Sequence, residues 1–97
     1  MSDIPQTTTI QIQLDEETAQ GTYANLVITN HGETEFTLDF VFLQPQQPRA
    51  KVRSRVLLAP LQAKRFAAAL QEGVAKYEAR FGAIDASRPG PGDISFH

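Results

Sequence analysis

The sequence predicts an α+β fold: a four-stranded antiparallel β-meander followed by one long C-terminal amphipathic helix packed on one sheet face. Two observations support this prediction. Apolar residues recur at every second position in several segments before residue 59, which is typical of half-buried strands. After Pro60 they recur at the three- and four-residue spacing of a helix that buries one face.

The length of the chain, 97 residues, leaves room for one domain. We expect a flexible N-terminus at residues 1–6, a single domain at 7–82 and a flexible Gly/Pro-containing tail at 83–97. A domain of this size buries only about two thirds of its unfolded surface, so its stability margin is small. The absence of cysteine excludes disulfides and thiolate metal sites. A partner subunit is the source of extra stability that we expect.

Alternating apolar and polar residues predict two strands in the first third of the chain, over residues 7–14 and 22–29. Their inward positions are Ile10, Ile12 and Leu14, and Ala24, Leu26 and Ile28. The turn after the second strand is predicted at Asn30-His31-Gly32. In such a three-residue loop the third position favours a left-handed conformation, which Gly32 adopts without steric conflict.

The third strand has the clearest alternation, and two prolines in the segment 44–48 end it because proline cannot donate to a strand ladder. The fourth strand is predicted over residues 50–58. The inward positions of these two strands are Phe36, Leu38, Phe40 and Phe42, and Val52, Ser54, Val56 and Leu58.

The helix is predicted over residues 60–81. Pro60 suits the first helical position, where its missing N–H has no partner in any case, and Gly82 ends the helix. Ala59 is a poor N-cap. The predicted inward stripe consists of Ala63, Phe66, Ala67, Leu70, Gly73, Val74, Tyr77 and Phe81.

The predicted turns also set the strand register. The Gly32 turn places Tyr23 opposite Asp39, and the proline-containing connection places Asp39 opposite Arg55 and Val41 opposite Arg53. Tyr23, Asp39 and Arg55 are therefore expected to form one cross-strand row, on the sheet face away from the helix.

Several strand and helix-start residues together resemble a known family. They are Tyr23-Ala24-Asn25, His31, Glu35-Phe36, Asp39-Phe40, Lys51-Val52, Arg55, Pro60, Ala63-Lys64-Arg65 and Tyr77-Glu78. With them, residues 10–82 resemble the bacterial and archaeal family known as domain of unknown function 3467. Ala59 stands where many members carry Ser or Thr. The resemblance implies no activity and no catalytic residues. The order of elements is also similar to that of SecB-type export chaperones, an analogy of fold alone that leaves a chaperone-like role as a minor third alternative.

The charge of the chain is unevenly distributed. All nine Lys and Arg residues follow residue 48, although the net charge is −2. Alternate basic residues on the fourth strand, extended by one flank of the helix, are candidates for binding phosphate groups. These candidates are Lys51, Arg53, Arg55, Arg65, Lys76 and Arg80. The alternative is charge compensation, in which Asp39 neutralises Arg55, and the negative net charge favours it.

The sheet face away from the helix is predicted to be more apolar than a face in open water. Its apolar residues are Tyr23, Val27, Val41, Leu43 and Leu57. Packing of a second copy face to face on this possible oligomer face would bury them. An oligomer formed along a sheet edge is the other arrangement that the sequence leaves open. An ordinary mixed surface is the alternative, because apolar atoms form more than half of a protein's exterior.

The sequence shows no catalytic apparatus, since it has no Gly-rich phosphate loop and no nucleophile beside a base. His31 lies near Glu33 and Glu35, but a solvated turn histidine is expected rather than a metal ligand. We expect no enzyme activity, no cofactor, no membrane span and a cytoplasmic location. The leading hypothesis is a homo-oligomeric interaction or assembly module that binds another protein. The alternative is a sequence-nonspecific nucleic-acid-binding protein.

Overall fold

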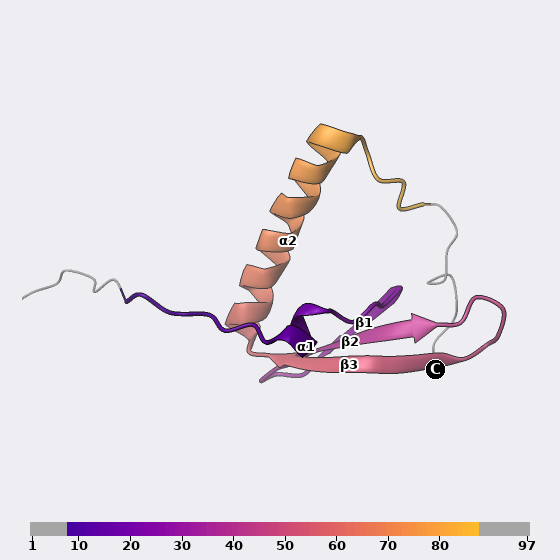
Figure 1. Cartoon of the computed structure of the whole chain (residues 1–97), viewed down its shortest axis with the longest axis horizontal. Helices are drawn as coiled ribbons and strands as arrows, with labels where there is room; N and C mark the ends of the chain where they lie inside the picture. Colours follow the sequence, from indigo (N-terminus) through magenta and orange to yellow (C-terminus); the bar gives the residue numbers. More distant parts are fainter. Residues whose placement is uncertain (1–7, 88–97) are drawn as a thin grey trace, which may run out of the picture.

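Residues 8–87 are described by the computed structural model and form an antiparallel sheet followed by a long helix (Figure 1). Within this range the strand order is β1-β2-β3. The elements are α1 (Glu16–Ala19), β1 (Leu26–His31), β2 (Phe36–Leu43), β3 (Ala50–Leu58) and α2 (Pro60–Phe81). The predicted α+β class and C-terminal helix are confirmed. The predicted flexible segment 1–6 and positions 88–97 of the predicted tail lie outside the described residues.

The sheet has three strands in the described range, and the prediction of a fourth over residues 7–14 was wrong. Residues 8–14 run away from the sheet (Figure 1), and Ile12 is 90% exposed. Alternation indicates which side chains share a face, but a strand also needs a neighbour that satisfies its backbone groups. The short helix α1 follows, and its N-cap Asp15 accepts a hydrogen bond of 3.1 Å from the N–H of Thr18.

The hairpin between β1 and β2 differs from the predicted three-residue turn. His31 pairs with Phe36, and the N–H of Gly32 donates to the carbonyl of Glu35 at 2.9 Å, so the loop covers residues 32–35. Because of the longer loop, each β2 residue pairs with a residue of β1 that lies an odd number of positions after the predicted partner. Asp39, for example, pairs with Ile28 and not with Tyr23. Such a shift moves every side chain to the other face. Leu26 and Ile28 therefore lie on the face of Asp39, not on the helix-facing side as predicted.

The β2–β3 pairing follows the predicted register only as far as Phe40, which pairs with Ser54. A β-bulge then leaves Arg53 without an opposite residue, and Val41 pairs with Val52. An inserted residue of this kind reverses the alternation beyond it. The predicted pairing of Val41 with Arg53 and the inward position of Val52 were wrong for this reason.

The buried residues of the described chain are concentrated in the central strand β2. They are Leu38, Asp39, Val41 and Leu43. Helix α2 has the predicted bounds, begins at Pro60 without a side-chain cap from Ala59, and ends at Gly82. It rises from the sheet at an angle (Figure 1), contacts mainly β3, and has no buried residue. The expected packing along the sheet face is therefore limited to part of the helix.

Candidate interaction surface

Asp39 and Arg55 form the predicted cross-strand pair. The Nε of Arg55 lies 2.7 Å from Oδ1 of Asp39, and Nη2 lies 2.9 Å from Oδ2. The Asp39 side chain is only 8% exposed, whereas that of Arg55 is 62% exposed. Hydrogen bonds from Arg55 and its positive charge lower the pKa of Asp39. The same hydrogen bonds and the negative charge of Asp39 raise the pKa of Arg55. A bidentate pair of this geometry fixes the guanidinium on the sheet.

Tyr23 does not complete this row, because the shifted register places Ile28 opposite Asp39. Tyr23 instead lies before β1, where its ring makes an edge contact with Phe42 at a centroid distance of 6.2 Å. The cross-strand row is therefore Ile28, Asp39 and Arg55.

The basic residues proposed to bind phosphate have different surroundings. Arg53, Lys51 and Arg49 line a small hollow beside Phe42, and the Arg53 guanidinium lies 5.2 Å from the centroid of that ring. We call these three residues and Phe42 the cationic hollow. Arg55 is engaged by Asp39 and contributes nothing to the lining of this hollow.

Two of the three helical cations of the same predicted set have local partners on α2. Lys76 lies 3.2 Å from Glu72, one turn away, and the Arg80 guanidinium stacks over the ring of Phe81 at 5.2 Å. Arg65 lies on the same helix. No helical residue lines the cationic hollow, so the six predicted residues do not form one site there.

The predicted oligomer face does not exist as a surface. Val41 is 1% exposed and Leu43 is 6% exposed, so the chain itself buries them. Tyr23, Val27 and Leu57 are exposed, but Val27 pairs with Phe40 and lies on the face that carries Leu38. The register shift in β1 explains the position of Val27, since it exchanged the two sets of β1 side chains.

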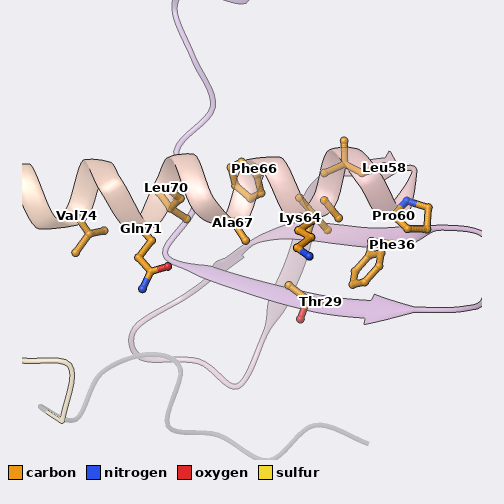
Figure 2. A pocket seen from close by; sticks show the side chains of 12 residues that line it. Thr29, Phe36, Leu58, Pro60, Lys64, Phe66, Ala67, Leu70, Gln71 and Val74 are labelled. Carbon is orange, nitrogen blue, oxygen red and sulfur yellow. The ribbon is translucent and has the colours of Figure 1, made fainter.

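An apolar groove of about 820 Å³ lies instead between α2 and the helix-facing side of the sheet (Figure 2). Figure 2 shows Thr29 and Phe36 on the sheet side and Ala67, Leu70 and Val74 on the helix above them. The lining residues are Thr29, Phe36, Leu38, Leu58, Pro60, Ala63, Lys64, Phe66, Ala67, Leu70, Gln71 and Val74. The groove thus has two walls from the same chain and remains open.

The predicted inward stripe of α2 continues the groove toward the C-terminal end of the helix. We call its large members the helix stripe: Phe66, Leu70, Val74, Tyr77 and Phe81. Phe66, Tyr77 and Phe81 are 42%, 50% and 65% exposed. Tyr77 and Phe81 contact each other at a ring distance of 5.0 Å. A helix face this apolar normally lies against another element.

Asn25 has a structural role that the sequence analysis did not identify. Its amide group accepts a hydrogen bond from the N–H of Leu43 at 2.9 Å and donates one to the carbonyl of Leu43 at 3.0 Å. A side-chain amide here takes the place of a peptide unit of the neighbouring strand. The only sequence signal was the position of Asn25 in the motif shared with the family.

His31 is exposed, and its ring lies 5.4 Å from that of Phe36. Within residues 8–87, no three His, Cys, Asp or Glu side chains are close enough together to hold a metal ion. Neither helix of this range has both the length and the apolar character needed to cross a membrane.

The fold and its surface define a small α+β protein with an open apolar groove between a sheet and a long helix. The sequence matches the family described as "Protein of unknown function (DUF3467)" over residues 1–86. The chain belongs to this family, as its strand and helix-start residues predicted, and the family description names no activity. No curated protein and no solved structure matches the chain.

Proposed function

We propose that this protein is a non-catalytic interaction and assembly module that acts as a homo-oligomer and binds another protein. The observation that supports the proposal is the open groove together with the helix stripe. A helix without a fully buried residue obtains little stability from packing, and tertiary packing is the usual source of helix stability in proteins. A second copy supplies the packing that α2 lacks.

The size of the exposed surface fits such a contact. At about 200 Å² per aromatic side chain, Phe66, Tyr77 and Phe81 together expose about 300 Å². Leu70, Val74 and the groove floor extend this area toward the roughly 800 Å² that each partner contributes to a stable interface. Contiguous apolar patches of several hundred Å² mark interaction sites on soluble proteins.

A second copy of the chain also fits by shape. A two-fold interface uses the same surface on both partners, so this surface must contain both a ridge and a hollow. Here Phe66, Leu70 and Val74 of the helix stripe form one wall of the hollow, and Tyr77 and Phe81 continue beyond it as the ridge. Two copies therefore each place α2 in the groove of the other.

Sequence-nonspecific nucleic-acid binding is the second candidate, and the cationic hollow favours it. Arg49, Lys51 and Arg53 line the same hollow as the ring of Phe42, an arrangement that suits a phosphate next to a stacked base. The stacking of Arg53 on Phe42 and the net charge of −2 rank this function below assembly.

The test is size-exclusion chromatography at low salt with light scattering and paired absorbance at 260 and 280 nm. We expect a dimer or larger oligomer without excess absorbance at 260 nm, which the absence of Trp makes easy to detect. Leu70→Glu should reduce the mass to that of a monomer. Ala68→Glu is the matched control, because position 68 lies about 160° away on the helix. A monomeric wild type, or equal masses for both variants, contradicts the proposal.

Nucleic-acid carry-over is measured in the same run. A peak rich in 260 nm absorbance that disappears at high salt would reverse the ranking of the two functions. The double variant Lys51→Ala/Arg53→Ala would then lose the carried nucleic acid and keep the melting temperature of the wild type.

A further inference from the structure

Residues 8–14, called the arm below, have the pattern of a strand but no neighbouring strand. Ile10, Ile12 and Leu14 alternate with polar residues and are all exposed, by 66% or more. The arm runs away from the sheet (Figure 1) and its backbone makes no hydrogen bond to another described residue. The backbone N–H and C=O groups of the arm and its row of apolar side chains are both available to a partner.

The two edges of the sheet differ in how well they accept another strand. β3 carries Lys51, Arg53 and Arg55 and has a bulge at Arg53, and proteins use both features to prevent pairing at an edge. β1 (Leu26–His31) has no Lys, Arg, Asp or Glu and no bulge in its pairing with β2. The arm also has no charged residue. The β1 edge is therefore the complementary one.

The arm is held away from the β1 edge of its own chain. Between them the chain forms α1, which Asp15 caps, and Asn25 fixes the start of β1 through two hydrogen bonds to Leu43. Gly21, with a φ of 78°, sets the turn between these two anchors. The direction of the arm thus follows from the local structure that precedes β1.

We propose that the arm of one copy pairs along β1 of a second copy as a fourth strand. The arm of the second copy pairs in the same way along β1 of the first. Exchange of an identical element is a common route to a dimer. The proposal rests on the homo-oligomer proposed above and specifies how it is built. Thr29 of β1 lines the groove, so an arm whose apolar row faces that side widens the groove floor with Ile10, Ile12 and Leu14.

Cysteine cross-linking between two differently tagged full-length chains tests the exchange, because the wild type has no cysteine. One chain carries Ile12→Cys, and the other carries a single cysteine at Val27, Ile28, Thr29 or Asn30 in turn. The two chains are co-expressed and oxidised with copper phenanthroline. A disulfide between chains of different tag size can only be intermolecular. Lys51→Cys on the β3 edge is the matched control.

We expect the best β1 position to cross-link to Ile12→Cys at least tenfold more than Lys51→Cys does. Equal yields at the two edges, or no mixed disulfide at any β1 position, overturn the arm exchange. Light scattering of the wild type separates the two proposals. An oligomeric wild type without the cross-link removes only the exchange, whereas a monomeric wild type removes the homo-oligomer as well.

Discussion

Asp39 makes Arg55 a structural residue, because a buried carboxylate on the central strand needs a cation. We predict that Arg55→Ala lowers the melting temperature by several degrees, since it leaves Asp39 unpaired at 8% side-chain exposure. Arg53→Ala is the control, as Arg53 only stacks on Phe42, and it should change the melting temperature by about 1 °C or less. Circular dichroism measures both. Equal losses would contradict the structural role of the pair.

The same pair predicts the acid sensitivity of the fold. Hydrogen bonds from Arg55 and its positive charge lower the pKa of folded Asp39 below its ordinary value of 3.8. The stabilisation is therefore complete above the unfolded-state pKa and is lost as the pH falls through the folded-state pKa. From about pH 5 to about pH 2, the melting temperature of the wild type should fall more steeply than that of Asp39→Asn.

Asp15→Asn is the control for this pH profile. Hydrogen bonds from Thr18 lower the pKa of Asp15 too, but Asp15 is exposed, and asparagine is an equally good N-cap. This variant should reduce the slope less than Asp39→Asn does. A profile of Asp39→Asn that coincides with that of the wild type would contradict the assignment.

Single residues were predictable from sequence only where the register was correct. The pairing of Asp39 with Arg55 was predicted correctly because the expected register holds from Phe36 to Phe40, although the bulge makes the pairs next to the β2–β3 connection differ from it by one residue. Tyr23 was misplaced because Gly32 does not take the predicted left-handed conformation and the loop is longer. The role of Asn25 depends on the position of Leu43 in space, which no local pattern specifies.

At the level of elements, alanine substitutions of Gly73 within α2 and of Gly82 at its C-cap should have opposite effects on stability. Gly82 has a φ of 99°, so Gly82→Ala should destabilise the fold by about 1 kcal/mol or more. Gly73 lies within the helix, and an added Cβ there meets nothing within 4 Å. Gly73→Ala should therefore stabilise the helix by about 0.5–1 kcal/mol. Urea denaturation of the two variants measures both values, and a shift of the same sign in each would contradict this assignment.

The elements whose bounds were predicted best are those with a proline or a glycine at their ends. β3 and α2 have the predicted bounds because Pro48 and Pro60 restrict the backbone at their starts and Gly82 takes the positive φ that ends the helix. The arm has the same alternation as a true strand, but pairing depends on a neighbour that alternation does not identify. The bulge at Arg53 likewise arises from the fit between β2 and β3 and leaves no pattern in either strand alone.

For the whole molecule, assembly should make stability depend on protein concentration. If the folded state is an oligomer, a tenfold increase in concentration should raise the melting temperature by a few degrees. The Leu70→Glu variant should show no such dependence, because its helix stripe carries a charge. Differential scanning calorimetry at three concentrations measures this, and a melting temperature of the wild type that does not change would contradict an obligate assembly.

The size of the chain and its lack of cysteine led us to expect a partner subunit, but the surface predicted for it was wrong. The sequence analysis selected the face that includes Val41 and Leu43, which the chain buries. It assigned the helix stripe to an intramolecular core, since a periodic apolar stripe has the same pattern whether its neighbour belongs to the same chain or to another. Only the angle between α2 and the sheet distinguishes these two cases.

This angle is set at one junction, because β3 ends at Leu58, α2 begins at Pro60, and only Ala59 lies between them. Proline restricts the residue before it to extended conformations, and Ala59 has φ −63° and ψ 152°. A helix of 22 residues is a lever about 33 Å long, so a rotation of 1° at Ala59 moves its far end by about 0.6 Å. The direction of α2 relative to the sheet therefore depends on how rigidly the Ala59-Pro60 dipeptide holds its conformation.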